Sequence, residues 1–202
     1  MRMGCAGRFL RWCPGAIGIL LRQKFYPYLL GSCGRGVLFG RFIDFRNVKN
    51  IHIGDNVVVG NRCCLLAGVD VENGRSIMIE NDVFIGIGTL LQADNGTIRI
   101  ENGSNLGSEC RVIARRSVAI GRNVLMAAYC TIGEDVSTCE SSQRNTFTTI
   151  GDNVWLGARS QVFASIHIGE GAIIGAHAMV KSSIGAYGIA MGRPASIVRY
   201  RK

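Results

Sequence analysis

Residues 150–180 read IGDNVWLGARSQVFASIHIGEGAIIGAHAMV. Aliphatic residues recur at every sixth position of this stretch, and a glycine follows four of the six. An α-helix would need apolar residues three and four apart, and a simple strand would need them two apart. A period of six is typical of short strands and turns that return to the same face every few residues, so the stretch predicts a hexapeptide β-helix. The six aliphatic positions are Ile150, Leu156, Val162, Ile168, Ile174 and Val180.

The same spacing continues backwards through the chain in triplets. Each triplet spans eighteen residues, which suits one triangular coil with one inward side chain per side, and six triplets predict about six coils. The residues left over between triplets number 8, 3, 2, 12 and 0, and we expect them to form loops at the corners. The longest loop, at 133–149, is where a rigid scaffold is expected to carry chemistry. The earlier triplets are Ile53, Val59 and Leu65; Ile79, Ile85 and Leu91; Ile100, Leu106 and Val112; and Ile120, Met126 and Ile132.

Composition and charge separate the N-terminal quarter from the rest. The chain has 202 residues, 48% of them apolar and 18% charged, which indicates one globular domain with or without an extension. The net charge is +9. Residues 1–50 hold nine basic residues and one acid, whereas residues 51–202 hold 14 basic and 13 acidic residues. The β-helix itself is therefore nearly neutral.

The basic N-terminal segment, residues 1–34, predicts an amphipathic helix or a helix pair interrupted at Pro14. Its apolar run at 16–21 is far shorter than the roughly 20 residues that span a bilayer. No small-residue cleavage site follows, so a signal peptide is not expected. Two compatible interpretations remain open: peripheral contact with an anionic membrane, or a cap on the open end of the β-helix. No nucleic-acid reader motif accompanies the charge. The candidate membrane anchors are Phe9, Trp12, Phe25 and Tyr26.

The eight cysteines predict reduced thiols in a cytoplasmic protein, since no secretory signal and no CxxC motif accompany them. Cys63 and Cys64 are adjacent and would point to opposite faces of a strand. Cys110 and Cys130 lie near inward positions, which favours small core side chains. Cys139 falls in the long loop.

Three motifs together resemble a known family. They are IGDNVWLGA at 150–158, IGA at 174–176 and MGRPASIVR at 191–199. With the coil pattern, they resemble the left-handed β-helix acyltransferases of the hexapeptide-repeat family. They are most similar to the maltose and galactoside O-acetyltransferases and to those of lipopolysaccharide, capsule and exopolysaccharide synthesis. The resemblance covers roughly 31–202. It implies an all-β, left-handed parallel β-helix domain at 35–202 with a C-terminal tail at 184–202.

The resemblance also implies a homotrimer with acetyl-CoA sites in the clefts between neighbouring β-helices. Trp155 matches the family tryptophan beside the acceptor and the thioester. Ala158 and Ala176 match small residues along which the pantetheine arm lies. No metal is implied.

The phosphates of CoA are expected to meet basic residues after the last full coil. Lys181 and Ser182 stand where the family has Thr-Lys, in swapped order. Arg199 matches a basic residue that meets the nucleotide end of CoA. Arg193 stands where the family has a small or amide residue, and it would add a phosphate contact through its planar fork.

The family's catalytic histidine has no counterpart at its expected place. The loop reads GEDVSTCE at 133–140, without a histidine. Either Asp135 or Glu134 could act as the base if desolvation raised the carboxyl pKa, or His177 could act from another wall of the cleft. His52 and His167 fit surface positions, and the three histidines are badly placed for a metal centre of the hexapeptide carbonic anhydrase type.

The sequence thus predicts an acyl-CoA-dependent O-acyltransferase. Acetyl would pass from acetyl-CoA to a sugar hydroxyl of a cell-surface polysaccharide or its lipid-linked precursor, at the cytoplasmic face of the membrane. Arg115 and Arg116 fit either a contact with an acidic sugar or phosphate, or a solvated turn. The alternative is a trimeric CoA- or sugar-binding scaffold without turnover.

Overall fold

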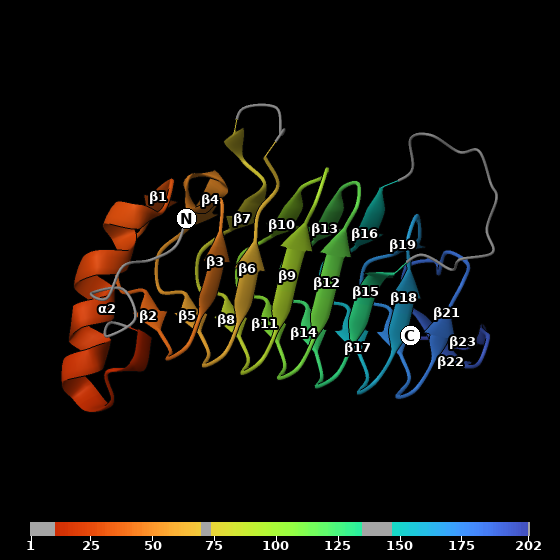
Figure 1. Ribbon diagram of the computed structural model, residues 1–202. Helices are drawn as coiled ribbons and strands as arrows, with labels where there is room; N and C mark the ends of the chain where they lie inside the picture. The colour runs from red at the N-terminus through yellow and green to blue at the C-terminus, as the bar shows by residue number, and fades with distance from the viewer. Residues whose placement is uncertain (1–10, 70–73, 135–146, 202) are drawn as a thin grey trace.

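The fold is a left-handed parallel β-helix with an N-terminal helix. In the computed structural model, which describes residues 11–69, 74–134 and 147–201, the strands form three sheets of seven, nine and seven strands. The sheets are the three sides of a prism, and the chain visits them in turn (Figure 1).

Each sheet takes one strand from every coil. The first sheet contains β1 (Ser32–Cys33), β4 (Ile51–Ile53), β7 (Ile77–Ile79), β10 (Ile98–Ile100), β13 (Val118–Ile120), β16 (Thr148–Ile150) and β19 (His167–Ile168). The second contains β2 (Leu38–Phe39), β5 (Val58–Val59), β8 (Phe84–Ile85), β11 (Asn105–Leu106), β14 (Leu125–Met126), β17 (Trp155–Leu156), β20 (Ile173–Ile174), β22 (Gly188–Gly192) and β23 (Ala195–Tyr200). The third contains β3 (Asp44–Arg46), β6 (Cys64–Leu66), β9 (Leu90–Ala93), β12 (Arg111–Ala114), β15 (Thr131–Glu134), β18 (Gln161–Phe163) and β21 (Met179–Val180).

The period of six is confirmed residue by residue. All eighteen aliphatic residues of the six triplets are at most 3% exposed. They pair with their counterparts in register, as Leu156 does with Met126 on one side and Ile174 on the other. Like side chains therefore stack along the axis of the prism and build one continuous core.

The β-helix extends beyond the six predicted coils at both ends. A further coil precedes them, in which Cys33, Phe39 and Phe45 pair with the first triplet. At the other end, the segment expected to be a tail is folded. There β22 continues the second sheet and β23 pairs with it in antiparallel fashion, so Arg199 lies on a strand.

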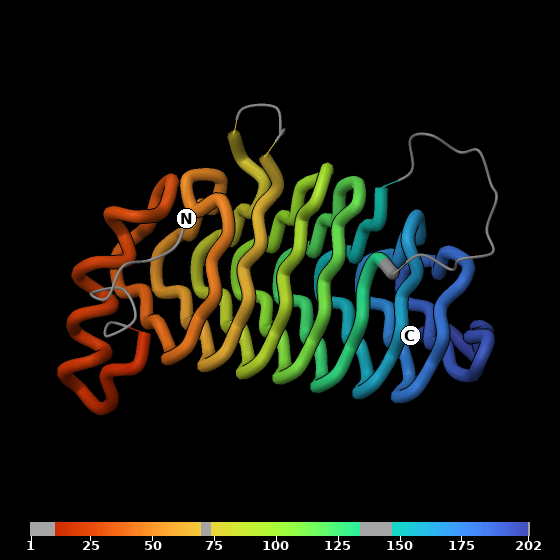
Figure 2. Tube along the Cα trace, viewed as in Figure 1, coloured from red at the N-terminus to blue at the C-terminus, as the bar shows by residue number. Residues whose placement is uncertain are grey.

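Helix α2 (Gly15–Leu29) closes the N-terminal end of the prism (Figures 1 and 2). It begins after Pro14, as the interruption predicted there suggests. The Tyr26 ring packs edge-on against Phe39 and Phe45 of the first coil, with centroids 5.2 and 5.4 Å away. The helix thus covers apolar side chains that the first coil would otherwise expose to water. No described helix is long and apolar enough to cross a membrane.

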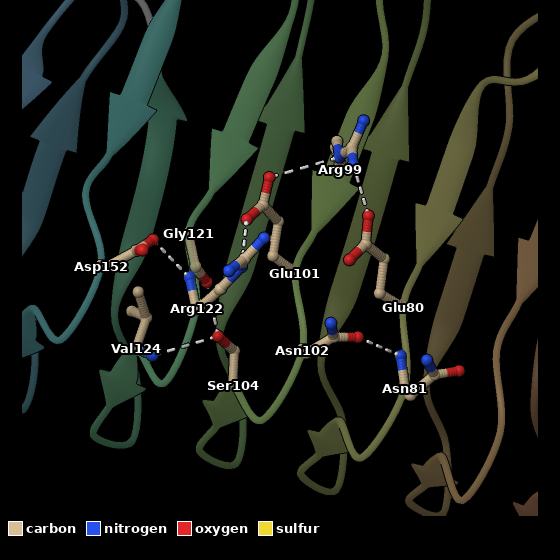
Figure 3. Close-up of polar contacts among 10 residues, drawn as sticks. All are labelled: Glu80, Asn81, Arg99, Glu101, Asn102, Ser104, Gly121, Arg122, Val124 and Asp152. Carbon is tan, nitrogen blue, oxygen red and sulfur yellow. Dashed lines mark hydrogen bonds and ion pairs between the residues drawn. The ribbon is translucent and has the colours of Figure 1, made fainter.

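The turns between the first and second sheets are joined by side-chain acceptors. The Asn102 Oδ1 atom accepts a hydrogen bond of 2.9 Å from the backbone N–H of Asn81 on the preceding coil. The Asp152 Oδ1 atom accepts one of 2.8 Å from the N–H of Arg122 in the same way (Figure 3). Asx side chains favour such turns because they bond to nearby backbone groups.

A chain of ion pairs crosses three coils beside these turns (Figure 3). Arg99 lies 2.5 Å from Glu80 and 3.5 Å from Glu101, and Glu101 lies 3.4 Å from Arg122. Because the pairs are partly exposed, each contributes at most about 1 kcal/mol. Two of the three pairs, Arg99–Glu80 and Arg122–Glu101, link neighbouring coils.

Candidate functional site

Trp155 lies in a row of residues that crosses the second sheet towards its C-terminal edge. Leu125, Trp155 and Ile173 pair in register on adjacent strands, Ile173 pairs with Ile189, and Ile189 pairs with Arg199. We call these five residues the cross-strand row. Trp155 is 48% exposed on the outer face. Strands lie about 4.8 Å apart, so three spacings place Arg199 about 14 Å from Trp155.

Ala158, Ala176 and His177 occupy the corner that follows this face. His177 N–H donates a 2.8 Å hydrogen bond to the Ala158 carbonyl, so the two turns stack directly. A side chain at Gly157 would meet the Ala176 backbone nitrogen at 2.5 Å, so only glycine allows the two coils to approach this closely. His177 is exposed and has a φ of +61°, a left-handed conformation that β-carbons disfavour.

Arg193 lies in the turn between β22 and β23, beyond the coil that carries Ala176. Gly175 N–H donates to the Ala190 carbonyl at 2.8 Å, and a β-carbon at Gly175 would approach the Met191 side chain. The hairpin therefore packs against the end of the β20 coil, and Arg193 is exposed at its tip. The fold gathers six of the predicted residues on the second sheet and its following corner: Trp155, Ala158, Ala176, His177, Arg193 and Arg199.

Lys181 and Ser182 lie elsewhere, at the corner between the third and first sheets. The Lys181 Nζ atom stands 5.8 Å from the Phe163 ring centroid, a cation–π arrangement. Phe163 pairs with Glu134 at the end of β15. Glu134 thus belongs to the Lys181 corner, away from the cross-strand row. Asp135 and Cys139 lie outside the described residues.

A small cavity of about 70 Å³ opens at this same corner, one to three coils towards the N-terminus from Lys181. Arg115, Arg116, Gly133, Thr148 and Ser165 contribute to its lining. The Ser165 N–H donates to the Thr148 Oγ1 atom at 3.0 Å and ties the two sides of the cavity together. Arg115 and Arg116 could be recognised from the sequence as a candidate ligand contact. Thr148 and Ser165 could not, because both match ordinary repeat positions.

The histidines do not converge within one chain. His52 bonds to Ser32 and His167 bonds to Thr149, both on the first sheet, whereas His177 lies at the corner after the second. Among the described residues, no group of three or more His, Cys, Asp or Glu side chains could hold a metal ion.

Two of the three core thiols, Cys63 and Cys110, have a raised pKa. Cys63, Cys110 and Cys130 are fully buried, which confirms the small core side chains predicted at Cys110 and Cys130. Burial raises the pKa of the Cys63 thiol to about 11. The pKa of Cys110 is also raised, by its hydrogen bond with Cys130 and then by burial. The hydrogen bond with Cys110 lowers the pKa of the Cys130 thiol, but Cys130 is fully buried. A nucleophilic thiol needs both a lowered pKa and access to solvent, so the three cysteines are structural.

Known proteins share these repeats. Residues 147–182 match the model described as bacterial transferase hexapeptide (six repeats). Residues 50–74 and 97–133 match the hexapeptide repeat of succinyl-transferase. No curated protein sequence matches the chain significantly.

Solved structures share the fold. The N-acyltransferase AntD from Bacillus cereus, in complex with dTDP and 3-hydroxybutyryl-CoA, is 21% identical with a TM-score of 0.60, over 90% of this chain and 88% of that one. The polysialic acid O-acetyltransferase OatWY is 18% identical with a TM-score of 0.61, over 85% of this chain and 92% of that one. At these identities the likeness shows the common β-helix. The chain thus carries hexapeptide repeats like those of bacterial transferases, and it shares its fold with AntD and OatWY.

Proposed function

We propose that the protein is an acyl-CoA-dependent O-acyltransferase that moves acetyl from acetyl-CoA to a sugar hydroxyl of a cell-surface polysaccharide or its lipid-linked precursor. The observation that carries the proposal is the cross-strand row, in which the exposed indole of Trp155 lies three strands away from Arg199 on the same sheet. Two structural neighbours support it: AntD was solved with an acyl-CoA, and OatWY is an O-acetyltransferase of a polysaccharide.

The row and its corner suit an extended thioester ligand. Trp155 offers a flat apolar surface for the acyl end, and Ala158 and Ala176 leave the backbone uncovered beside it. Arg193 and Arg199 offer planar guanidinium groups for the phosphates at the other end. In the transfer, the acceptor oxygen bonds to the thioester carbonyl carbon and the carbon–sulfur bond breaks. A base accepts the hydroxyl proton and CoA leaves as the thiol.

A homotrimer is part of the proposal, because one chain separates the two halves of the predicted site. Trp155 and His177 lie on the second sheet and its following corner, while Glu134 and Lys181 lie at the corner between the third and first sheets. The exposed side chains of Leu38, Phe84, Leu125 and Trp155 make the second sheet apolar on its outer face, as interfaces often are. A neighbouring chain packed there would bring the second half of the site to the first.

The proposed base is one of Glu134, Asp135 and His177. The test measures acetyl-CoA turnover through the release of free CoA thiol. We compare the wild type with Glu134→Gln, Asp135→Asn and His177→Ala, using a panel of sugars and an extract of lipid-linked precursors as acceptors. Loss of the base costs about 10²–10⁴-fold. One variant is expected to fall by that factor while its binding of acetyl-CoA stays intact.

Calorimetry with acetyl-CoA separates the enzyme from a scaffold. An enzyme must bind acetyl-CoA, and Arg199→Ala should weaken that binding because a phosphate contact is lost. Tight binding with no turnover on any acceptor would favour a CoA-binding scaffold, which the missing loop histidine would explain. A wild type that binds no acetyl-CoA at about millimolar concentration would refute both the enzyme and the CoA-binding scaffold, and would leave a sugar-binding scaffold.

The proposed location is the cytoplasm, at the inner face of the cell membrane. Acetyl-CoA as donor and the free cysteines of the described residues both fit a reducing compartment. Fractionation of cells that express the full chain tests this, with recovery from an oxidising compartment as the opposing result.

A further inference from the structure

Helix α2 has one buried charged residue, Arg22. Gly18, Arg22 and Tyr26, spaced by four, face the first coil and are buried. Arg22 donates from Nε to the Phe39 carbonyl and from Nη1 to the Cys13 carbonyl, each at 2.9 Å. The inner face of the helix is thus anchored by hydrogen bonds as well as by the Tyr26 ring, and capping the prism uses this face alone.

The outer face of α2 is apolar, although capping gives it no role. Ile17, Leu20 and Tyr28 are 70%, 65% and 76% exposed, and the spacing of three and eight places them on the side opposite Arg22. We call these three residues, with Lys24 between them, the outer stripe. Trp12 and Phe25 add exposed rings beside it. A surface helix normally carries polar residues on this side, so a contiguous apolar stripe marks an interaction site.

Cations surround the outer stripe. Lys24 lies within it and is exposed. Arg41, also exposed, adjoins the N-terminal approach to the helix, because Phe42 N–H donates to the Arg11 carbonyl. At the other end, the Lys49 Nζ atom is 3.3 Å from the Tyr28 carbonyl. Asp44 is the single acid among residues 1–50, and Arg11 pairs with it at 3.4 Å. The charge around the helix is therefore positive, with its one acid already matched.

We propose that α2 docks the protein on an anionic membrane, with the outer stripe in the interface and the neighbouring cations at the lipid headgroups. An apolar stripe with an interspersed lysine fits the boundary between headgroups and acyl chains, where a lysine can extend its ammonium to the surface. The helix lies across one end of the prism, so the β-helix projects from the docked end without obstructing it (Figure 1). This inference concerns a surface remote from the proposed acyl-transfer site and does not depend on it.

Co-sedimentation of the full chain with vesicles tests the docking. Vesicles of phosphatidylcholine alone are compared with vesicles that also contain phosphatidylglycerol. The wild type is expected to sediment with the anionic vesicles. The double variant Ile17→Ser/Leu20→Ser should lose about tenfold or more in partition, because two buried aliphatic side chains are lost from the interface. Lys24→Gln should lose about fivefold, the effect of one basic residue near a charged surface.

A matched control removes the same kind of side chain elsewhere. Val69 and Val198 are 73% and 57% exposed outside the helix, and the double variant Val69→Ser/Val198→Ser should sediment like the wild type. Thermal unfolding should be unchanged in both double variants, because the altered residues are exposed. The inference is refuted if the wild type ignores anionic vesicles or if the control loses as much as the helix variant. It is equally refuted if Ile17→Ser/Leu20→Ser changes only the self-association of the protein, which would make the stripe a contact between copies.

Discussion

At the residue scale, Trp155 is the side chain most readily tied to the ligand. It is half exposed on a flat sheet, so its removal should leave the core intact. We expect Trp155→Ala to raise the Kd for acetyl-CoA about tenfold or more, because the ligand loses a large apolar contact. Calorimetry measures this. Tyr187→Ala removes another half-exposed ring, at the corner where the chain enters the second sheet, and should bind acetyl-CoA as the wild type does. An equal loss of affinity in Tyr187→Ala would contradict the assignment of Trp155.

A glycine variant of His177 can distinguish the conformational strain of this residue from a catalytic role of its imidazole. Its φ of +61° costs a non-glycine residue about 1 kcal/mol, which glycine avoids. His177→Gly should therefore unfold at the same urea concentration as the wild type or a higher one. If the imidazole is the base, the same variant loses about 10²-fold or more in turnover despite its stability. A stable and fully active His177→Gly would leave the loop carboxylates as the candidates.

Cys63 predicts a loss of stability in alkaline solution. Its thiol has a pKa of about 11 in the folded chain and 9.0 as the reference for the unfolded chain. Below pH 9 both states hold the proton, and the thiol contributes no pH dependence. Between pH 9 and 11 the unfolded chain releases it first, so the free energy of unfolding falls with rising pH. Two units correspond to about 2–3 kcal/mol.

Urea unfolding on either side of this window measures the effect of the Cys63 thiol. Cys63→Ser keeps a small hydrogen-bond donor two residues before an inward aliphatic residue, the position that Ser160 occupies in a later coil. As the pH rises, the free energy of unfolding of Cys63→Ser should fall less than that of the wild type. Cys64→Ser removes the neighbouring half-buried thiol and should behave more like the wild type. Equal pH dependence in the wild type and Cys63→Ser would show that other groups cause it.

Sequence reasoning reached Trp155, Ala158 and Ala176 because repeat positions and motifs determine where they lie. It could not assign Arg22, since nothing in a basic segment distinguishes an arginine that bonds to two buried carbonyls from one in water. The separation of Lys181 from Trp155 on different sides of the prism could be counted from the sequence, because no extra residue interrupts the period of six between them.

At the scale of the element, α2 is attached through Arg22. Burial lowers the pKa of the guanidinium, so placing this charge inside has a cost. Two charge-assisted hydrogen bonds offset that cost. Arg22→Met would leave the Phe39 and Cys13 carbonyls buried without these donors. We expect it to destabilise the N-terminal end by about 1–3 kcal/mol. Lys24→Met, two residues away on the exposed side, is the matched control and should change stability little.

Limited proteolysis is the suitable readout for Arg22→Met, because coils of a repeat protein can open locally. Cleavage should begin in or near α2 and come earlier than in the wild type, with the C-terminal coils still resistant. If Arg22→Met and Lys24→Met are cleaved alike, the buried hydrogen bonds are not what attaches the helix.

A strand or coil could be predicted from the sequence where its inward residues keep the spacing of six and are aliphatic. Six coils followed from aliphatic residues six apart. The first coil has the same spacing, but Cys33, Phe39 and Phe45 replace the aliphatic residues there, so the pattern is hidden. The two phenylalanines contact the Tyr26 ring of α2. The C-terminal hairpin abandons the period altogether, because β23 runs antiparallel and closes the sheet.

At the scale of the whole molecule, the two ends of the prism are covered and one side is apolar. The helix α2 covers the first coil, and the hairpin of β22 and β23 ends the second sheet. A solenoid needs such ends to avoid stacking indefinitely. The outer face of the second sheet still presents Phe84 and Leu125, 43% and 47% exposed, in the same face as Trp155. Neither end structure reaches the middle of this face, which leaves it available to another copy of the chain.

Charges introduced on that face should therefore disrupt the proposed trimer. The double variant Phe84→Glu/Leu125→Glu is expected to sediment as a single 21.8-kDa chain, whereas the wild type sediments as three, because carboxylates are costly to bury in an apolar interface. Ile17→Ser/Leu20→Ser, altered at the end of the prism, should remain trimeric. If the proposed site is shared between chains, turnover should disappear with the trimer, because one chain holds Trp155 and the Glu134–Lys181 corner on different sides of the prism. A monomeric variant that keeps full activity would mean that one chain holds a complete site, and a wild type that is itself monomeric would refute the shared site directly.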